Sequence, residues 1–384
     1  MIPQARVAAA IGILDQILNG APAEQALLRW SRASRFAGSG DRAAVRDLVF
    51  DALRQRDSLA AHGGGRTGRG LMLGRARAIG ADPETIFTGE GHAPAPLSSE
   101  ERDAGGTPTA DQRLNLPGWL VPLWARALGD EAGPIAEAMA ERAPVWLRVN
   151  SRKADVATAL AALADDGVEA TTDPRLPTAL RVLAGERRIN ASHAYLDGLV
   201  ELQDLSPQLA CAALPVADGQ RVLDFCAGGG GKALAIGARA RLDLAAHDAD
   251  PGRMADLPAR AARAGLRIRI EPRPEGAYDL VIADVPCSGS GTWRRTPDAK
   301  WRLAPADLAR LQTVQAGILD RVAGLLRPGG HLAYMTCSLL DEENRDQIAA
   351  FLARHPQFAP LWQRRWSPLD ASDGFFLALL QRQE

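Results

Sequence analysis

Two cysteines occupy positions where a strand is expected to end and a polar loop to begin. Residues 283–292 read ADVPCSGSGT, in which Asp284 closes an apolar run and Cys287 follows three residues later. Residues 331–338 read HLAYMTCS, in which Cys337 comes directly after a second apolar run. In an open α/β sheet, ligands bind at the carboxyl ends of the strands. We therefore expect both thiols and the Asp284 carboxyl group to face one cleft.

This set of groups suits covalent catalysis on a pyrimidine ring. Carbon 5 of cytosine is a poor nucleophile, but attack of a thiolate on carbon 6 enables carbon 5 to accept a methyl group. A carboxyl group near ring N3 and the exocyclic amine, here Asp284, would stabilise the developing charge. A second thiol could help remove the carbon 5 proton or release the product. From the residues alone, either Cys287 or Cys337 can be the thiol that attacks.

A structural role is the main alternative for each cysteine. A lone cysteine on an apolar strand is usually a small core residue, and we interpret Cys211 and Cys226 mainly in this way. Cys287 and Cys337 differ, because each lies in a polar loop at the end of one of two adjacent strands. The target base must leave its stack to reach such a cleft, and the glycines of the SGSG loop would let that loop move.

A glycine-rich turn predicts a nucleotide pocket. Residues 221–233 read RVLDFCAGGGGKA, an apolar strand that runs into four glycines and then a helix. Glycines let the backbone pass close to a ligand, and a helix N-terminus offers unpaired N–H groups. Cys226 and Ala233 rule out a Walker loop. The next strand ends at Asp248, where an acidic residue typically binds the ribose of a nucleotide cofactor, with Asp250 as a near alternative.

A basic segment with interleaved tryptophans follows the Cys287 loop. Such a segment suits contact with an RNA backbone and stacking on bases, although a solvated charged loop is a serious competitor. Lysine occurs only three times in the chain, so a lysine in a motif is informative. The expected RNA-binding residues are Arg294, Arg295, Lys300 and Arg302.

The remaining composition favours a cytoplasmic protein that binds RNA. The net charge is −1, but residues 1–77 hold twelve Arg and six acidic residues, a local charge of +6. No apolar run is long enough to cross a membrane, and the four cysteines form no metal-type pair. The six histidines are scattered, so no metal site is expected.

The pattern of apolar residues predicts three domains. Residues 1–85 read as a helical domain, with a first helix around residues 7–18 and a helix capped by Asp41. Residues 86–115 have the composition of a linker, and residues 116–205 read as a small α/β domain. Residues 206–384 alternate strands and helices, which indicates a doubly wound sheet. The expected strands are 221–225, 242–247, 267–271, 278–283 and 331–336, with helices near 231–240, 251–264 and 305–325, the last ended by Gly329–Gly330.

The motifs closely resemble the Sun family of RNA 5-methylcytosine methyltransferases over most of the chain. The segments DVPCSGSGTWRRTPDAKWR and TCSLLDEEN are highly specific, whereas DFCAGGGGK and the final DGFFLALL are weaker. The resemblance implies a Rossmann-like catalytic domain dependent on S-adenosylmethionine, preceded by a NusB-like helical RNA-binding domain and a small RRM-like α/β domain. It implies a monomer that acts on RNA, with 16S ribosomal RNA favoured, and no membrane partner.

The resemblance also implies roles for individual residues. The cysteine of TCS, Cys337, would be the nucleophile, the cysteine of PCS, Cys287, would assist and release the product, and Asp284 would contact the base. The residues expected to line the cofactor pocket are Asp224, Cys226, Ala227, Gly228, Gly229, Gly230, Lys232, Asp248, Asp250 and Asp284. The chain departs from the family after the third strand, where it lacks the usual Gly-Asp pair near the adenine, and Glu271 is the candidate substitute.

Three other functions compete with this one. A tRNA cytosine-5 methyltransferase would have the same site, and the sequence does not specify the target nucleotide. A ribosome-assembly factor that binds RNA without catalysis is favoured slightly by the short third-strand loop, but the intact cysteine pair argues against it. A DNA methyltransferase usually has its attacking thiol in the Pro-Cys motif and is not expected to carry the second cysteine.

Overall fold

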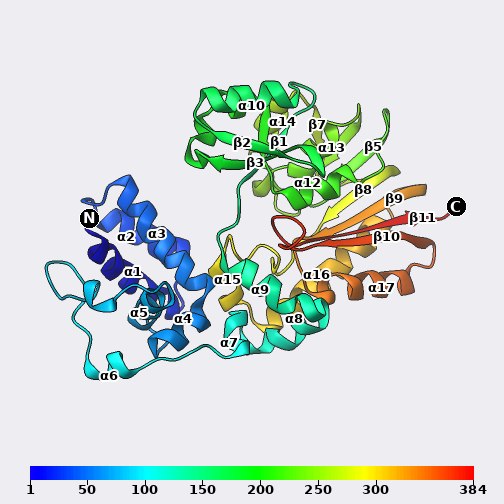
Figure 1. The fold of residues 1–384 in the computed structure, drawn as a ribbon. Coiled ribbons are helices and arrows are strands. Elements are labelled where there is room, and N and C mark those ends of the chain that lie inside the picture. Colours follow the sequence, from blue (N-terminus) through cyan, green and yellow to red (C-terminus); the bar gives the residue numbers. More distant parts are fainter. The chain divides into compact units, whose positions relative to one another are not determined.

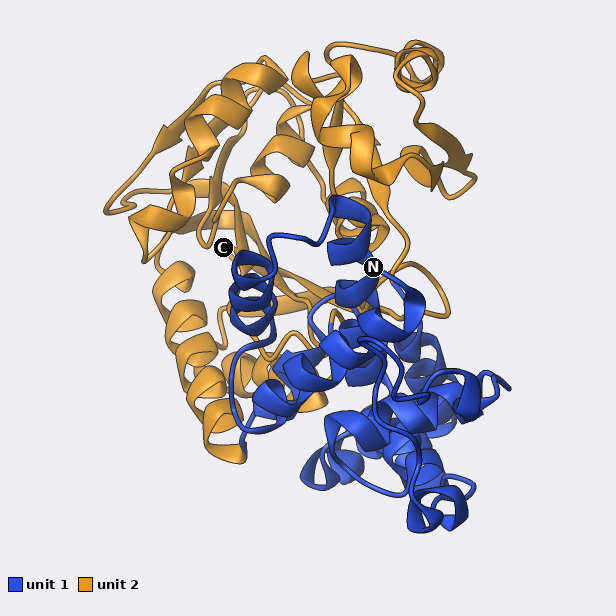
Figure 2. Ribbon diagram, turned by 90° about the vertical axis from the view of Figure 1, so that its left-hand side faces the viewer, with its two compact units in different colours: residues 1–142, 293–304 blue, residues 143–292, 305–384 orange.

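The chain folds into two compact units. The computed structural model describes all residues from 1 to 384. Unit 1 comprises Met1–Arg142 and Trp293–Ala304, and unit 2 comprises Ala143–Thr292 and Pro305–Glu384 (Figures 1 and 2). The boundaries of these units differ from the domain boundaries expected at residues 86, 116 and 206. The reason is that Trp293–Ala304, from the second half of the chain, packs with the N-terminal helices. None of the helices combines the length and the apolar character that crossing a membrane requires.

Unit 1 is built from helices around one apolar core. Its first five helices are α1 (Pro3–Leu18), α2 (Ala23–Ala33), α3 (Ser39–Arg54), α4 (Arg56–Gly63) and α5 (Gly68–Ala78). The predicted first helix is thus confirmed, and its core side chains include Ile13 and Leu14. Helices α4 and α5 approach closely at Gly74, where a Cβ atom would lie 1.9 Å from the Leu59 carbonyl oxygen. Only glycine fits at that crossing.

Asp41 stabilises the start of α3 from inside the first turn. It was expected to cap the helix, but the N-cap residue is Gly38 and Asp41 is the third helical residue. Its carboxylate accepts a hydrogen bond from the Gly38 N–H at 3.3 Å, and it pairs with the Met1 amino group at 3.1 Å and with Arg6 at 2.9 Å. These bonds lower the pKa of Asp41, with the amino group as the main cause. The helix therefore starts three residues earlier than expected.

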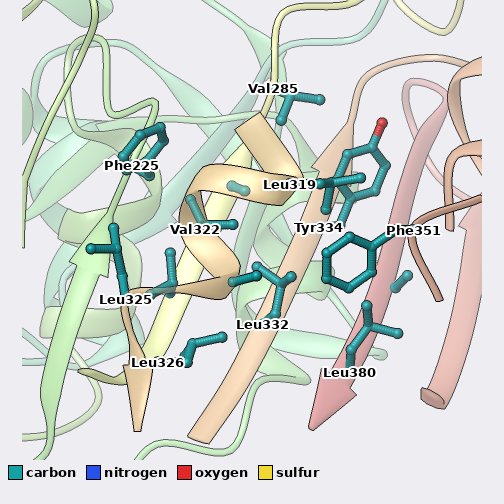
Figure 3. Packing of buried hydrophobic residues seen from close by; sticks show 14 of the residues in the cluster. Phe225, Val285, Leu319, Val322, Leu325, Leu326, Leu332, Tyr334, Phe351 and Leu380 are labelled. Atoms are coloured by element: carbon teal, nitrogen blue, oxygen red, sulfur yellow. The ribbon is translucent and has the colours of Figure 1, made fainter. Parts of the chain in front are cut away.

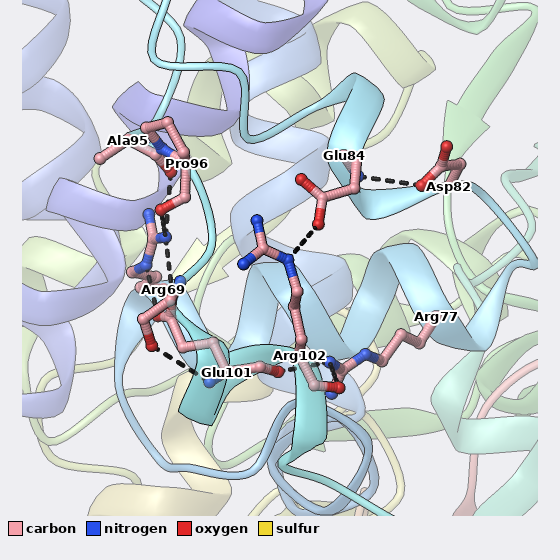
Figure 4. Close-up of polar contacts among 9 residues, drawn as sticks. Arg69, Arg77, Asp82, Glu84, Ala95, Pro96, Glu101 and Arg102 are labelled. Carbon is pink, nitrogen blue, oxygen red and sulfur yellow. Dashed lines mark hydrogen bonds and ion pairs between the residues drawn. The ribbon is translucent and has the colours of Figure 1, made fainter.

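The predicted linker is anchored to the helices rather than extended. It follows η1 (Pro83–Thr85) and contains α6 (Ser99–Asp103) and α7 (Ala110–Leu114). Arg69 pairs with Glu101 at 2.6 Å, and Arg77 donates to the carbonyl oxygens of Glu101 and Arg102 (Figure 4). The hydrogen bond from Arg69 lowers the pKa of Glu101 to about 2. After η2 (Gly118–Leu120), α8 (Val121–Leu128), η3 (Gly129–Glu131) and α9 (Ala132–Ala140) complete this part of the chain.

Unit 2 begins with a small antiparallel sheet. Its strands are β1 (Trp146–Val149), β2 (Glu169–Asp173), β3 (Leu176–Ala184) and β4 (Val200–Leu202), in the order β2-β3-β1-β4. Helix α10 (Val156–Asp165) connects β1 to β2, whereas η4 (Glu186–Ala191) and α11 (His193–Leu196) connect β3 to β4. Apolar residues of these elements form a separate core that includes Leu147, Leu163 and Leu180.

The second sheet of unit 2 is mixed and has seven strands. They are β5 (Arg221–Asp224), β6 (Asp243–Ala246), β7 (Ile268–Ile270), β8 (Tyr278–Asp284), β9 (Leu326–Thr336), β10 (Phe358–Trp366) and β11 (Phe375–Arg382). Their order is β10-β11-β9-β8-β5-β6-β7, with β5 to β9 parallel and β11 antiparallel to both of its neighbours. The five predicted strands are confirmed. Gly329–Gly330 does not end a helix as expected, because it lies inside β9 at an irregularity of its pairing with β8.

Helices cover both faces of this sheet. Alternate residues of the central strands face opposite sides, so Val281 and Tyr334 pack with α16 (Pro305–Ala323) and α17 (Arg345–Arg354) (Figure 3). Leu280 and Met335 belong to the core of the other face, with α12 (Leu205–Ala212) and α13 (Gly231–Gly237). Helix α14 (Leu257–Ala264) follows η5 (Pro251–Met254). The direction of strand succession reverses between β5 and β8, and ligands bind at such a switch point.

Candidate active site

The glycines after β5 form a turn that a residue with a side chain could adopt only with strain. Gly228 and Gly230 have φ values of +49° and +79°, in the left-handed region. A Cβ atom at Gly230 would lie 2.2 Å from a methyl carbon of Leu257. Arg260 donates to the Gly229 carbonyl oxygen at 2.6 Å. The turn is thus braced by α14, and its backbone lies at the carboxyl end of the central strand.

Asp224 ends β5 as a buried carboxyl group with spare hydrogen-bonding capacity. It is 1% exposed, and its Oδ2 accepts a hydrogen bond from the Ala233 N–H at 3.1 Å. Its Oδ1 has no partner. Burial raises the pKa of Asp224 to about 7. An unpaired acceptor beside a glycine turn fits a ligand that offers a hydrogen-bond donor.

Asp248 lies at the end of the neighbouring strand β6 and faces the same turn. It is 5% exposed, and its Oδ2 accepts from the Gly228 N–H at 3.0 Å. Arg253 pairs with it at 3.4 Å. Asp250 is exposed, and its carboxylate accepts from the Gly252 N–H at 2.9 Å, which shapes the start of η5. The geometry therefore favours Asp248 over Asp250 as the acidic group of the pocket.

The other residues expected near the cofactor lie on the same edge of the sheet. Burial is the main cause that raises the pKa of Cys226, so this thiol is unreactive. Ala227 is buried, and its N–H donates to the His247 carbonyl oxygen at 2.9 Å. The carboxylate of Glu271, the proposed substitute for the missing adenine contact, pairs with Arg269 at 3.1 Å. Its backbone carbonyl oxygen lies 3.0 Å from the His247 ring.

Lys232 and Asp284 form an ion pair between α13 and the end of β8. Burial works to lower the pKa of Lys232, but the Asp284 carboxylate outweighs it and the net shift is upward. The lysine therefore stays protonated. Two of the residues expected in one cleft are thus in direct contact.

Cys287 and Cys337 meet at the ends of the adjacent strands β8 and β9. Asp284 pairs with Met335 in the parallel register of β8 and β9, so the loops after both strands start side by side. The Sγ atoms of Cys287 and Cys337 are 3.3 Å apart, within hydrogen-bonding distance for sulfur. Both thiols are free. The two thiols and Asp284 thus lie at one edge of the sheet, as the sequence predicted.

The pair is electrostatically unequal. The hydrogen bond from Cys287 is the main cause that lowers the pKa of Cys337, with a further contribution from Lys232. The same hydrogen bond, together with burial and the charge of Glu343, raises the pKa of Cys287. Because a thiolate rather than a thiol is the nucleophile, Cys337 is the thiol prepared to attack.

The basic segment that follows Cys287 is largely buried within unit 1. Lys300, in α15 (Pro297–Arg302), is 4% exposed, and its Nζ donates to the Arg54 carbonyl oxygen at 2.9 Å. Burial lowers the pKa of Lys300 to about 7. Arg294 is 5% exposed, and its carbonyl oxygen accepts from Arg54 Nε at 2.7 Å. The expected RNA contact is therefore incorrect for Arg294 and Lys300, because neither cation lies at the surface.

The rest of that segment also packs on α3. Trp301 donates from its indole nitrogen to the Leu53 carbonyl oxygen at 2.7 Å, and Arg56 lies over its ring at 3.5 Å. Arg295 and Arg302 are exposed, and Arg302 pairs with Asp298 at 3.3 Å. For these two exposed residues, the contact with RNA stays a prediction.

Sequence reasoning missed the polar residues buried beneath the two thiols. Glu343, Gln315 and Ser290 are all 0% exposed, and they connect the loops that carry Cys287 and Cys337. One signal was available in the sequence. A serine directly follows each cysteine of the pair, and serines at matching positions suggest a shared hydrogen-bond partner.

The fold and this site together place the chain in the class of Rossmann-like, S-adenosylmethionine-dependent methyltransferases. Residues 211–381 match the family described as 16S rRNA methyltransferase RsmB/F, and residues 116–189 match the ferredoxin-like domain of RsmF/B-like methyltransferases. The ribosomal RNA small subunit methyltransferase B of Klebsiella pneumoniae is 36% identical over 288 residues, which cover 70% of this chain and 67% of that protein. Its namesake from Salmonella typhi is 36% identical over 290 residues, covering 71% and 67%. The chain belongs to the RsmB/F family of RNA methyltransferases.

Solved structures show the same fold. The crystal structure of PH0851 has a TM-score of 0.77 and 24% identity, and the match covers 100% of this chain and 99% of that one. The structure of NSun6 from Pyrococcus horikoshii with SFG has a TM-score of 0.62 and 16% identity, covering 70% and 98%.

Replacing Asp248 with alanine will weaken S-adenosylmethionine binding by roughly 10- to 100-fold, the usual effect of losing a hydrogen bond to a charged group. The variant loses both the proposed acceptor for the ribose and the bond that holds the Gly228 N–H. Isothermal titration with the cofactor measures this directly, without RNA. Asp250→Ala is the matched control, and a larger loss for Asp250→Ala than for Asp248→Ala would assign the ribose contact to Asp250 instead.

Proposed function

We propose that this protein methylates carbon 5 of a cytosine in 16S ribosomal RNA, acting as a monomer in the cytoplasm. The observation that carries the proposal is the pair of thiols 3.3 Å apart at the ends of β8 and β9. Membership in the RsmB/F family and the names of its relatives support ribosomal RNA as the substrate. S-adenosylmethionine supplies an electrophilic methyl group when it is bound.

Each reactive side chain has one role in the proposed reaction. The Cys337 thiolate attacks carbon 6 of the base, and the new C–S bond makes carbon 5 nucleophilic enough to take the methyl group. Asp284, held by Lys232, accepts a hydrogen bond from the exocyclic amine and so orients the ring. Water takes up the carbon 5 proton, the electrons of that C–H bond restore the ring double bond, and the C–S bond breaks so that Cys337 departs as a thiolate. Cys287 assists that release from its position beside the sulfur.

The residues proposed to hold the cofactor are those of the glycine turn and the two acidic strand ends. The unpaired Oδ1 of Asp224 fits the amino group of the methionine part, and Asp248 fits the ribose hydroxyl groups. Gly228, Gly229 and Gly230 allow the backbone to approach the ligand.

One incubation tests the substrate. Purified protein is mixed with labelled S-adenosylmethionine and either unmodified 16S ribosomal RNA or unmodified tRNA, and nucleosides are then separated. We expect label in 5-methylcytosine from the ribosomal RNA only. Label in tRNA alone would establish the tRNA enzyme instead, and binding of RNA with no transfer to either substrate would favour the ribosome-assembly factor.

We further propose that the NusB-like helical part of unit 1 binds RNA through the corner between α2 and α3. Phe36 is 75% exposed in that corner, an unusual state for an aromatic side chain. The only acidic residue between positions 25 and 46 is Asp41, and its carboxylate forms ion pairs with the Met1 amino group and with Arg6. Exposed arginines of this corner are Arg29, Arg32, Arg35 and Arg42, whereas the exposed Arg46 pairs with Glu24 at 2.6 Å. An exposed aromatic ring among arginines suits base stacking together with phosphate contacts.

Phe36→Ala will weaken RNA binding by roughly 5- to 100-fold, as expected for the loss of one base-stacking contact. KM for RNA will rise by a similar factor while kcat stays unchanged, because the side chain is remote in sequence from the thiol pair. Arg35→Ala will reduce the slope of log affinity against log salt by about 1. Ile79→Ala, in the same unit at 61% exposure, is the control and should have no effect. Equal effects at Phe36 and Ile79 would contradict the proposed RNA surface.

A further inference from the structure

A buried carboxylate without a cationic partner lies beneath the thiol pair. Glu343, in η6 (Asp341–Glu343), is 0% exposed, and no lysine, arginine or histidine forms an ion pair with it. Burying a charged group is unfavourable unless hydrogen bonds replace its water shell. A folded chain retains such a group when it performs a task that a neutral side chain would not perform.

Hydrogen bonds from three elements satisfy this carboxylate. Its Oε1 accepts from the Ser288 N–H at 2.8 Å and from the Gln315 side chain, in α16, at 3.0 Å. Its Oε2 accepts from the hydroxyl groups of Ser288 and Ser338, the latter at 2.6 Å. Gln315 also donates to the Pro286 carbonyl oxygen at 3.0 Å.

These bonds connect the two loops that carry the thiols. Ser288 directly follows Cys287, and Ser338 directly follows Cys337. One carboxylate therefore holds both loops through the residue next to each sulfur. Ser290 adds a second connection, because its hydroxyl group lies 2.9 Å from that of Ser338.

The main charges that act on the two thiols differ, and Glu343 is among those that act on Cys287. A hydrogen bond between two sulfur atoms is symmetric by itself, so the surrounding charges decide which sulfur keeps the proton. The charge of Glu343 helps to raise the pKa of Cys287. The charges that act on Cys337 are Asp284, which raises its pKa, and Lys232, which lowers it.

Tyr334, the other titratable group near the thiol pair, adds no charge to its surroundings. Tyr334, on β9, donates its hydroxyl hydrogen to the Glu343 carbonyl oxygen at 2.6 Å. Burial raises the pKa of Tyr334, so the phenol stays neutral. Lys232 and Asp284 form an ion pair with each other. Glu343 is thus a buried carboxylate without an ion-pair partner that hydrogen-bonds to the loops of both sulfurs.

We infer that Glu343 is a positioning residue that ties the two cysteine loops together and directs the shared proton to Cys287, so that Cys337 carries the thiolate. This inference deepens the proposed function, on which it rests for the identity of the nucleophile. The carboxylate does not touch the substrate. It acts through the two sulfur atoms, by geometry and by charge.

Alkylation of the free protein by iodoacetamide tests the inference without RNA or cofactor. Initial rates at Cys287 and Cys337 are read from their peptides by mass spectrometry between pH 6 and pH 10. In the natural protein, we expect Cys337 to react first, with an apparent pKa below the ordinary value of 9.0 for a cysteine thiol. In Glu343→Gln the preference for Cys337 will fall by about tenfold at neutral pH, which corresponds to one pKa unit in thiolate population.

Two further variants separate charge from shape. Glu343→Asp keeps the charge but shortens the reach, so it will retain the preference for Cys337 while methyl transfer slows. Glu342→Gln removes the adjacent charge and will leave both the preference and the transfer rate unchanged. A folded Glu343→Gln with the natural preference would overturn the inference. If Glu343→Gln does not fold, loss of the preference in Glu343→Asp would overturn it equally.

The alkylation experiment tests the role of Glu343 separately from the proposed RNA substrate. If the protein methylates no RNA but Glu343→Gln still loses its preference for Cys337, the proposed function fails and the proton assignment stands. If RNA is methylated but the two thiols of the natural protein react equally, only the inference about Glu343 fails.

Discussion

Cys337→Ala will reduce kcat/KM for RNA methylation by at least roughly 10⁴-fold, the scale seen when a covalent nucleophile is removed from other enzymes. Without a thiolate at this position, carbon 6 of the base is not attacked, and carbon 5 stays a poor nucleophile. Binding of S-adenosylmethionine and RNA will be unchanged, because the proposed cofactor pocket and RNA surface lie on other residues. Transfer of labelled methyl groups to 16S ribosomal RNA measures the loss, and titration calorimetry measures the binding.

Cys211→Ala is the matched control for that result. Cys211 is a core residue at 2% exposure, and burial raises its pKa to about 12, so its thiol has no expected reactivity. Its replacement will cost some stability and leave the transfer rate near that of the natural protein. If Cys337→Ala kept measurable turnover while Cys287→Ala lost all bond formation to RNA, the two roles would have to be exchanged.

Cys287→Ala will convert the enzyme into a trap that accumulates a covalent complex with RNA. Cys337 can still attack the base, but the group that assists breaking of the C–S bond is absent. Turnover will fall by roughly 10²-fold or more, the typical range for loss of an acid or base. The complex will appear as a slower band on a denaturing gel after incubation with labelled RNA and S-adenosylmethionine.

The double variant Cys287→Ala/Cys337→Ala provides the control for the trap. It will form no covalent band, because the nucleophile is gone, although it will still bind RNA. A covalent band in the double variant would show that another residue bonds to the base. Absence of the band in Cys287→Ala, combined with normal turnover, would remove the product-releasing role of Cys287.

The thiolate populations of Cys287 and Cys337 also depend on pH in different ways. The pKa of Cys337 is lowered from the ordinary thiol value, so its thiolate is present at a lower pH than that of an isolated cysteine. The pKa of Cys287 is raised, so this thiol keeps its proton well into the alkaline range. The two thiols therefore differ most in their thiolate fractions at a pH between these two pKa values.

The amino-acid sequence by itself determined the five parallel strands of the central sheet and the convergence of the reactive groups, but not the antiparallel strands β10 and β11. Apolar runs bounded by glycine and polar residues predicted all five parallel strands, because strands buried on both faces need continuous apolar side chains. The carboxyl ends of parallel strands lie at one edge, so residues after those strands meet there. For this reason the sequence alone predicts that five residues lie near one another, namely Asp224, Asp248, Asp284, Cys287 and Cys337.

Only the tertiary structure decided which polar residues are exposed and which are buried. Lys300 and Arg294 lie in a basic run that is typical of an RNA-binding loop, yet their burial depends on α3, more than two hundred residues earlier. The same packing assigns residues 293–304 to unit 1, a division that no local pattern contains. The local sequence around residues 294–300 does not indicate that helix α3, which lies far away in the chain, will cover them.

The proton assignment within the thiol pair is likewise a property of the folded chain. Either cysteine could be the nucleophile as far as residue types are concerned, and only the family resemblance favoured Cys337. In the structure, the charge of Lys232 helps to lower the pKa of Cys337, whereas the charge of Glu343 helps to raise the pKa of Cys287. Charges act over a few ångströms of space rather than along the sequence, so the fold alone decides which thiol holds the proton.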